Sequence, residues 1–138
     1  MFKRILLATD GSKHSVRSAD YAIQLAEKFK GTIDVVYVVD GQKSKSDVLH
    51  HDSKYEIMQR RKEKIQHVLN QIEGNNIDYN VQILHGEPGP VIVEFANSHD
   101  FDCIVIGSRG LNNLQTMILG SVSHKVAKRA DCPVLIVK

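Results

Sequence analysis

The feature that most constrains the fold is a set of short segments whose apolar residues are consecutive instead of alternating. Residues 5–8 read Ile-Leu-Leu-Ala, residues 35–39 read Val-Val-Tyr-Val-Val and residues 103–106 read Cys-Ile-Val-Ile. A strand with one face in water alternates apolar and polar residues, whereas a strand covered on both faces is apolar throughout. These segments therefore predict inner strands of a parallel sheet.

Helical patterns lie between these strands. Apolar residues at i, i+3 and i+4 predict a helix that ends at Phe29, and the capping box of Ser53 and Glu56 predicts a second helix that runs to Glu73. A third helix is expected after Pro88 and a fourth from about residue 122 to residue 130. The chain therefore alternates between strands and helices along its whole length.

Two further strands complete the pattern. Residues 79–83 alternate apolar and polar side chains, which indicates a strand with one exposed face at an edge, and residues 133–137, with Pro133 first, form a last apolar strand. The order predicts an α/β fold in one domain over residues 1–138. This fold is a doubly wound parallel sheet of five strands with helices on both faces and right-handed crossovers.

Composition excludes several classes of function. A chain of 138 residues with 42% apolar content is sufficient for one core, and a net charge of +2 is too small to indicate nucleic-acid binding. No apolar run approaches the ~20 residues of a membrane span, and the N-terminus lacks a signal-peptide pattern. We therefore expect a cytoplasmic protein that binds neither nucleic acid nor membrane. The basic run at residues 60–62 is expected on a solvated helix face.

Three other features have open or structural interpretations. Residues 41–52 are polar without a period, so they form either a mobile surface loop or a lid. Cys103 and Cys132 have apolar neighbours, which favours buried thiols that could lie close together without forming a disulfide. The pair His50 and His51 lacks metal-ligand spacing and nearby ligands, so no metal site within the protein is expected.

The strongest functional signal is the pattern Gly107-x2-Gly110-x9-Gly120-Ser121, between a strand and a helix. Glycines let a ligand approach the backbone, and a helix N-terminus offers unpaired N–H groups that attract anions. Ser121 and Ser123 add hydroxyl donors, so the stretch indicates a phosphate site. The alternative is an ordinary turn with Ser121 as the helix cap. Neither a P-loop nor a dinucleotide-binding glycine pattern occurs.

Together with Ala8-Thr-Asp-Gly-Ser12 and Gly86-Glu-Pro88, this pattern resembles the universal stress protein family over essentially the whole chain. Within the family, the glycine pattern is typical of the ATP-binding subgroup. The resemblance implies strand order 3-2-1-4-5 in a Rossmann-like fold of the adenine nucleotide alpha hydrolase kind. In that order, the first and fourth strands meet at the point where ligands bind.

The resemblance also implies residue roles. Asp10, beside Thr9, would accept hydrogen bonds from the ribose or base; on sequence grounds it could equally cap the first helix. Val38 would pack on adenine; its alternative role is in the core, and the two roles can hold together. Ile106 would contact the nucleoside. The implied nucleotide-binding residues are Thr9, Asp10, Val38, Ile106, Gly107, Arg109, Gly110, Gly120, Ser121, Val122 and Ser123.

In this scheme the loop that starts at Gly107 wraps the phosphates of ATP, and Mg²⁺ or Mn²⁺ is held through those phosphates. Arg109 reaches a phosphate or is solvated. No catalytic residue is expected, since the phosphate loop lacks a lysine or carboxylate. The favoured function is an ATP-binding regulatory protein of the stress response with slow or no turnover. The alternatives are a nucleotide hydrolase or transferase, and a nucleotide-free dimeric interaction module.

The resemblance finally implies a homodimer that pairs through the strand at residues 133–137. In the implied order this strand is an edge, and an exposed apolar edge invites pairing with another chain.

Overall fold

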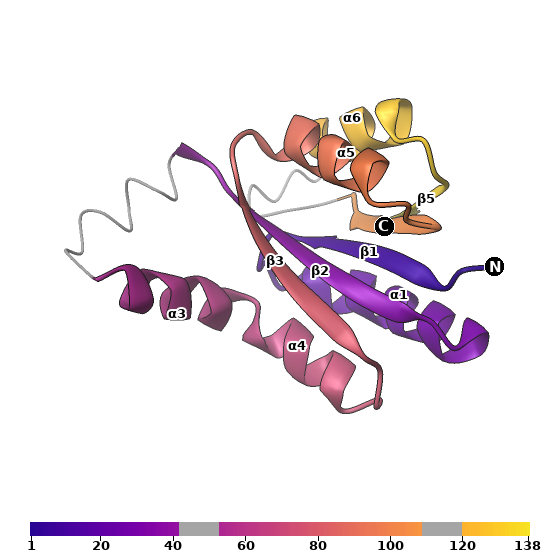
Figure 1. The fold of residues 1–138 in the computed structure, drawn as a ribbon, viewed down its shortest axis with the longest axis horizontal. Coiled ribbons are helices and arrows are strands. Elements are labelled where there is room, and N and C mark those ends of the chain that lie inside the picture. The colour runs from indigo at the N-terminus through magenta and orange to yellow at the C-terminus, as the bar shows by residue number, and fades with distance from the viewer. Residues whose placement is uncertain (42–52, 109–119) are drawn as a thin grey trace.

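A computed structural model describes residues 1–41, 53–108 and 120–138 of the chain. Its sheet has five parallel strands in the order β3-β2-β1-β4-β5, so the predicted fold and strand order are confirmed (Figure 1). The elements are β1 (Arg4–Thr9), α1 (Ser15–Phe29), β2 (Thr32–Val39), α3 (Lys54–Lys64), α4 (Gln66–Glu73), β3 (Tyr79–His85), α5 (Pro88–Ser98), β4 (Cys103–Gly107), α6 (Ser121–Arg129) and β5 (Val134–Val137).

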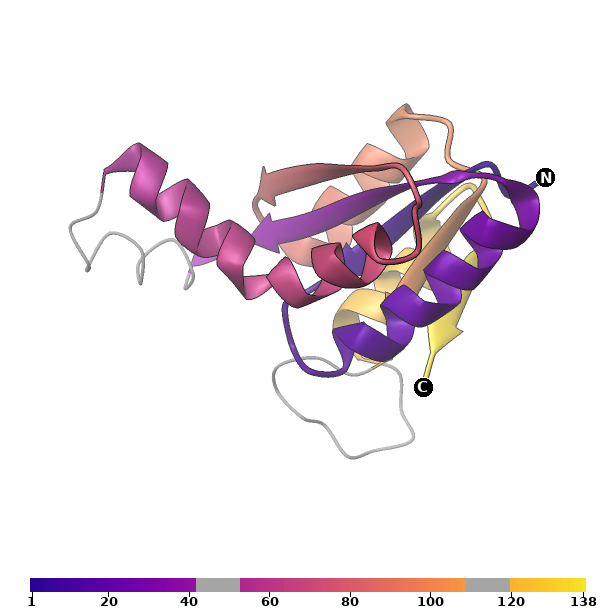
Figure 2. The same cartoon turned by 90° about the horizontal axis from the view of Figure 1, so that it is seen from below.

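The helices cover the two faces of the sheet in separate groups. Helices α1 and α4 pack on one face around Leu7, Val35 and Val105, whereas α5 and α6 pack on the other around Leu6 and Ile104 (Figures 1 and 2). These five side chains are fully buried, as expected for strands whose apolar residues are consecutive. The apolar runs therefore predicted the centre of the sheet correctly.

The helix predicted from Ser53 to Glu73 is divided at Ile65. The capping box is confirmed at its start, where the Ser53 hydroxyl accepts from the Glu56 N–H, but Ile65 leaves helical geometry with φ −111° and ψ 7°. Ile65 is fully buried, and the turn after β1 lies against the end of α3, where a Cβ on Gly11 would be 3.0 Å from the Lys64 carbonyl oxygen. The break lets Ile65 enter the core while the β1 turn contacts α3.

The expectation that residues 60–62 lie on a solvated helix face was wrong for Arg61, which is buried, and Arg60 is half-buried. Arg61 is only 9% exposed, and its guanidinium donates to Nε2 of His85 at 3.0 Å. His85 ends β3, so this contact holds α3 against the edge of the sheet. A buried guanidinium requires acceptors, which the sequence pattern of a charged run does not reveal.

Cys103 is the first residue of β4, whereas Cys132 lies two residues before β5, and the two cysteines belong to different faces of the sheet. Cys103 packs in the cluster under α1, and Cys132 packs against the cluster under α5 and α6; both are free thiols. The expected absence of a disulfide agrees with this arrangement.

Within the described ranges, no helix combines the length and apolar content that a membrane crossing needs.

Candidate functional site

The candidate site lies at the carboxyl ends of β1 and β4. Ala8 pairs with Ile106 and Thr9 pairs with Tyr37, so the residues that follow β1 lie between the ends of β2 and β4. The chain leaves β1 toward β2 on one side, while β4 pairs on the other side. This is the point of reversal at which ligands bind in open parallel sheets.

The turn after β1 is organised by the Asp10 carboxylate. Its Oδ1 accepts the Ser12 N–H at 2.9 Å and the Ser15 hydroxyl at 3.4 Å, and the Gly11 N–H donates to the Thr9 hydroxyl at 3.3 Å. Gly11 has φ +78°, a conformation that favours glycine. Asp10 therefore stabilises the turn after β1. It does not cap α1, as the alternative from the sequence had it, because the cap residue is His14 and no side chain caps the helix.

Gly120 is the cap residue at the start of α6, one residue before the serine considered as a cap in the sequence. The first intrahelical bond runs from the His124 N–H to the Gly120 carbonyl at 2.9 Å. The N–H groups of Ser121, Val122 and Ser123 precede that donor, so the helix supplies no acceptors for them. They form the positive end of the helix dipole and can receive an anion.

The two serines of this turn differ in burial and in role. Ser123 is 2% exposed, and its hydroxyl donates to the Gly120 carbonyl at 3.0 Å. In the structure that hydroxyl therefore stabilises the turn, instead of adding a free donor as the sequence suggested. Ser121, by contrast, is exposed.

The ends of the glycine stretch lie close together. A Cβ built on Gly120 would lie 3.3 Å from the Ser108 carbonyl oxygen, tighter than most such contacts, and Ser108 itself donates to the Val137 carbonyl at 2.8 Å. The end of β4 at Gly107 and the start of α6 are thus held side by side. Arg109 and Gly110, two of the predicted site residues, lie outside the described residues.

The predicted nucleoside contacts are part of the core beneath this edge. Val38 and Ile106 are each 5% exposed and belong with Ala8 to the cluster under α5 and α6. Val38 is therefore part of the core, and contact with a base would involve only its outermost surface. Thr9, Asp10 and Gly107 are half-buried at the same edge.

The chemistry of this edge suits an anion better than a metal ion. Across the described ranges no group of three or more histidine, cysteine or acidic side chains could hold a metal. The Glu87 carboxylate lies 2.9 Å from the Lys125 ammonium in an ion pair on the same side of the sheet.

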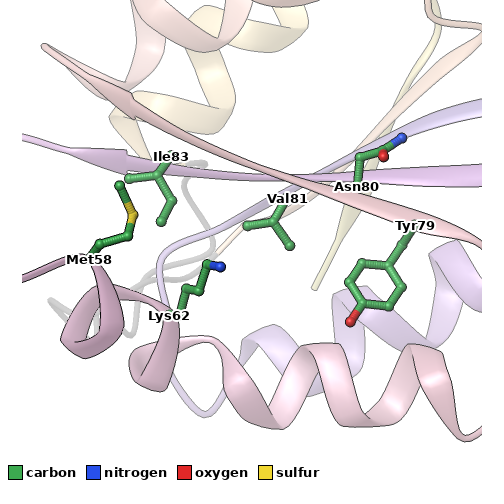
Figure 3. Close-up of a pocket in the computed structure, with 6 residues that line it drawn as sticks. All are labelled: Met58, Lys62, Tyr79, Asn80, Val81 and Ile83. Carbon is green, nitrogen blue, oxygen red and sulfur yellow. The ribbon is translucent and has the colours of Figure 1, made fainter. Parts of the chain in front are cut away.

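Sequence reasoning missed a second feature, a groove of about 490 Å³ between α3 and β3. Met58, Lys62, Tyr79, Asn80, Val81 and Ile83 line it (Figure 3). The alternating pattern of residues 79–83 indicated the edge strand. The break in the helix at Ile65, which places α3 over that edge, left no signal in the sequence.

Comparisons with known proteins agree with this architecture. The model of the universal stress protein family matches residues 1–138. Universal stress protein MJ0531 of Methanocaldococcus jannaschii is 36% identical to the chain, covering 100% of it and 83% of the relative.

Among solved structures, MJ0577 of the same organism superposes with a TM-score of 0.82 at 29% identity, covering 100% of this chain and 96% of that one. A universal stress protein from Archaeoglobus fulgidus in complex with dAMP has the same fold, with a TM-score of 0.74 at 24% identity and 100% coverage of both chains.

Proposed function

The chain belongs to the universal stress protein family, and we propose that it is an ATP-binding member that acts as a regulatory module of the stress response. The observation that carries this proposal is the N-terminus of α6, held against the end of β4 by the close approach of Gly120 to Ser108. That N-terminus lies at the carboxyl edge where Asp10 follows β1.

Each part of an adenine nucleotide has a complementary group at this edge. The N–H groups of residues 121–123 suit the phosphates, because they lack intrahelical acceptors and carry the positive end of the dipole. Asp10 suits the ribose hydroxyls as an acceptor, and the apolar end of β2 at Val38 suits the base. The dAMP complex of the Archaeoglobus fulgidus relative supports an adenine nucleotide as the ligand class.

Residues 107–110 and 120–123, which include Arg109 and Gly110, would enclose the phosphates, and Mg²⁺ or Mn²⁺ would be held through them. Fast hydrolysis needs a base that positions water and cations at the γ-phosphate. The only acid in the turn after β1, Asp10, is engaged with Ser12 and Ser15. We therefore propose slow or no turnover, so that occupancy, and not product formation, is the signal.

Isothermal titration calorimetry with ATP and Mg²⁺ tests the site. Gly120→Val should abolish measurable binding, because its side chain meets the Ser108 carbonyl and separates β4 from α6. Gly41→Val is the matched control, since a Cβ at Gly41 meets nothing within 4 Å. Equal affinity of the two variants for ATP would contradict the phosphate site.

Turnover distinguishes the regulatory protein from the alternative, a hydrolase or transferase. Phosphate release from ATP should be far slower than the ~1–10³ s⁻¹ of ordinary enzymes. Turnover within that range, lost in Gly120→Val, would favour the enzyme. Absence of ATP binding with an intact fold would favour the nucleotide-free interaction module.

A further inference from the structure

The outer edge of β3 takes no part in the proposed nucleotide site. The strand ends the sheet on the side away from β4 and β5, and no described residue pairs with its outer side. Unpaired strand edges readily accept another strand, and proteins commonly block them with charges, proline or a covering segment. Here the strand contains no proline, and its only ionisable side chains are Tyr79 and His85 at its two ends.

The register shows which backbone groups face outward. Ile33 donates to the Asp78 carbonyl and Gly86 donates to the Val39 carbonyl, so the even-numbered residues of this stretch bond to β2. Because bonding alternates along a parallel strand, the N–H and C=O groups of residues 79, 81 and 83 point away from β2. This edge can therefore form the regular hydrogen bonds of an added strand.

The same three residues supply the apolar side of the groove. Tyr79, Val81 and Ile83 are only partly buried and pack at the margin of the core under α1 and α4. Figure 3 shows Met58 and Lys62 of α3 facing Ile83 and Val81 across the groove. Met58 is 39% exposed, so apolar surface remains accessible beside the free edge.

Charge indicates what kind of segment fits. Helix α3 carries five basic and two acidic residues, and Lys62 lines the groove itself with an exposed side chain. At the other end of the groove, the Tyr79 hydroxyl donates to the Glu73 carboxylate, which would repel an acidic group. An acidic side chain of an occupant is therefore favoured beside Lys62 and disfavoured beside Tyr79.

We propose that the edge of β3 and the groove under α3 bind an extended peptide segment of a partner protein as a sixth strand. Its groove-facing side chains are apolar, with one acidic residue beside Lys62. Backbone hydrogen bonds to residues 79, 81 and 83 supply affinity, and the apolar and basic groups select the sequence, as in other cases of strand addition. The site is distinct from the α6 N-terminus, so a nucleotide and a peptide can bind together.

The probe is the fluorescein-labelled peptide Thr-Ile-Thr-Glu-Thr-Val-Thr, whose apolar and acidic residues lie on one face when it is extended. Binding is measured by fluorescence anisotropy with the full chain. In ¹H–¹⁵N spectra, the amide protons of Tyr79, Val81 and Ile83 should shift and become protected from exchange. The corresponding peptide with lysine in place of glutamate should bind several-fold more weakly.

Two variants test the two parts of the site. Val81→Pro removes an outward N–H without removing a bond to β2, and it should weaken binding about tenfold. Lys62→Glu reverses the charge in the groove and leaves the backbone hydrogen-bonding groups of β3 unchanged; it should weaken binding about fivefold. Lys28→Glu, an equal change of charge on an exposed residue of α1, is the matched control and should leave affinity unchanged.

Binding weakened in both groove variants and unchanged in the control supports the proposal. Absence of binding at about 1 mM peptide would overturn it, as would affinity that is equal in all variants. Concentration-dependent shifts of the same three amides in the free protein would show a second copy of the chain on this edge, and would also overturn it. Because nucleotide affinity is measured separately with Gly120→Val, failure of either proposal leaves the other intact.

Discussion

Asp10 combines a structural role that is visible in its contacts with a proposed ligand role, and substitution can separate them. Asp10→Asn retains Oδ1 as the acceptor for Ser12 and removes the negative charge, whereas Asp10→Ala removes both. We expect Asn to change the free energy of unfolding little and Ala to lower it by about 1 kcal/mol.

For ATP, the Asn variant should bind about tenfold more weakly, because an amide is a poorer acceptor than a carboxylate for ribose hydroxyls. Calorimetric titration and urea unfolding measure the two effects. Unchanged ATP affinity in both variants would restrict Asp10 to the turn.

Cys103 provides a pH-dependent prediction at the same scale. Burial raises the pKa of its thiol to about 11, with a further contribution from Cys132, whose own pKa is raised by burial. In the unfolded chain the thiol deprotonates near its ordinary value of 9.0, so between that value and about 11 unfolding releases a proton. Stability should therefore fall as the pH rises through this window.

Urea unfolding at about pH 8 and about pH 10.5 measures this fall, and Cys103→Ala should show a smaller one. At about pH 8 the native thiol should also react slowly with iodoacetamide, since the thiolate is the reactive species. Rapid alkylation of native Cys103 would contradict its burial.

At the scale of elements, the sequence predicted what repeats along the chain and missed what depends on contacts between elements. The strands follow from consecutive or alternating apolar residues, and the capping box of Ser53 marked the start of α3 correctly. The break at Ile65 and the burial of Arg61 depend on the turn at Gly11 and on His85, which lie far away in the sequence. Helical periodicity cannot report such tertiary contacts.

The contact of Arg61 with His85 tests how α3 is held on the sheet. His85→Ala removes one acceptor of a buried guanidinium and should lower the free energy of unfolding by about 1–3 kcal/mol. His85→Gln, whose Oε1 can accept the same bond, should restore part of that loss. Urea unfolding of the three proteins measures the effect. Equal stability of the Ala variant would show that the contact contributes nothing net to the packing of α3.

For the whole molecule, topology was more predictable than the details of the site. The parallel order brings Ala8 and Ile106 into register, so proximity of the β1 turn to Gly107 follows from the strand order alone. The direction of the Ser123 hydroxyl does not follow, because the choice between a ligand and the Gly120 carbonyl depends on local geometry. The sequence therefore predicted which segments the fold brings together better than which atoms each side chain contacts there.

Assembly is the last property at this scale, and the two edges of the sheet differ in what they offer. Pro133 accepts from Ile104 and Val137 accepts from Ser108, so the backbone groups of residues 134 and 136 face away from β4. The side chains of Val134 and Ile136 are partly exposed and apolar. We therefore propose that two copies of the chain pair through β5.

Val134→Lys places a charge on that edge and should convert the dimer to a monomer of 15.5 kDa in sedimentation velocity. Val16→Lys, the same substitution at a 46% exposed position of α1, should leave the dimer unchanged. If ATP affinity remains equal in the two variants, the nucleotide site is complete within one protomer. Dimers that persist in Val134→Lys would place the contact on another surface, because a lysine directly at a strand edge opposes pairing there.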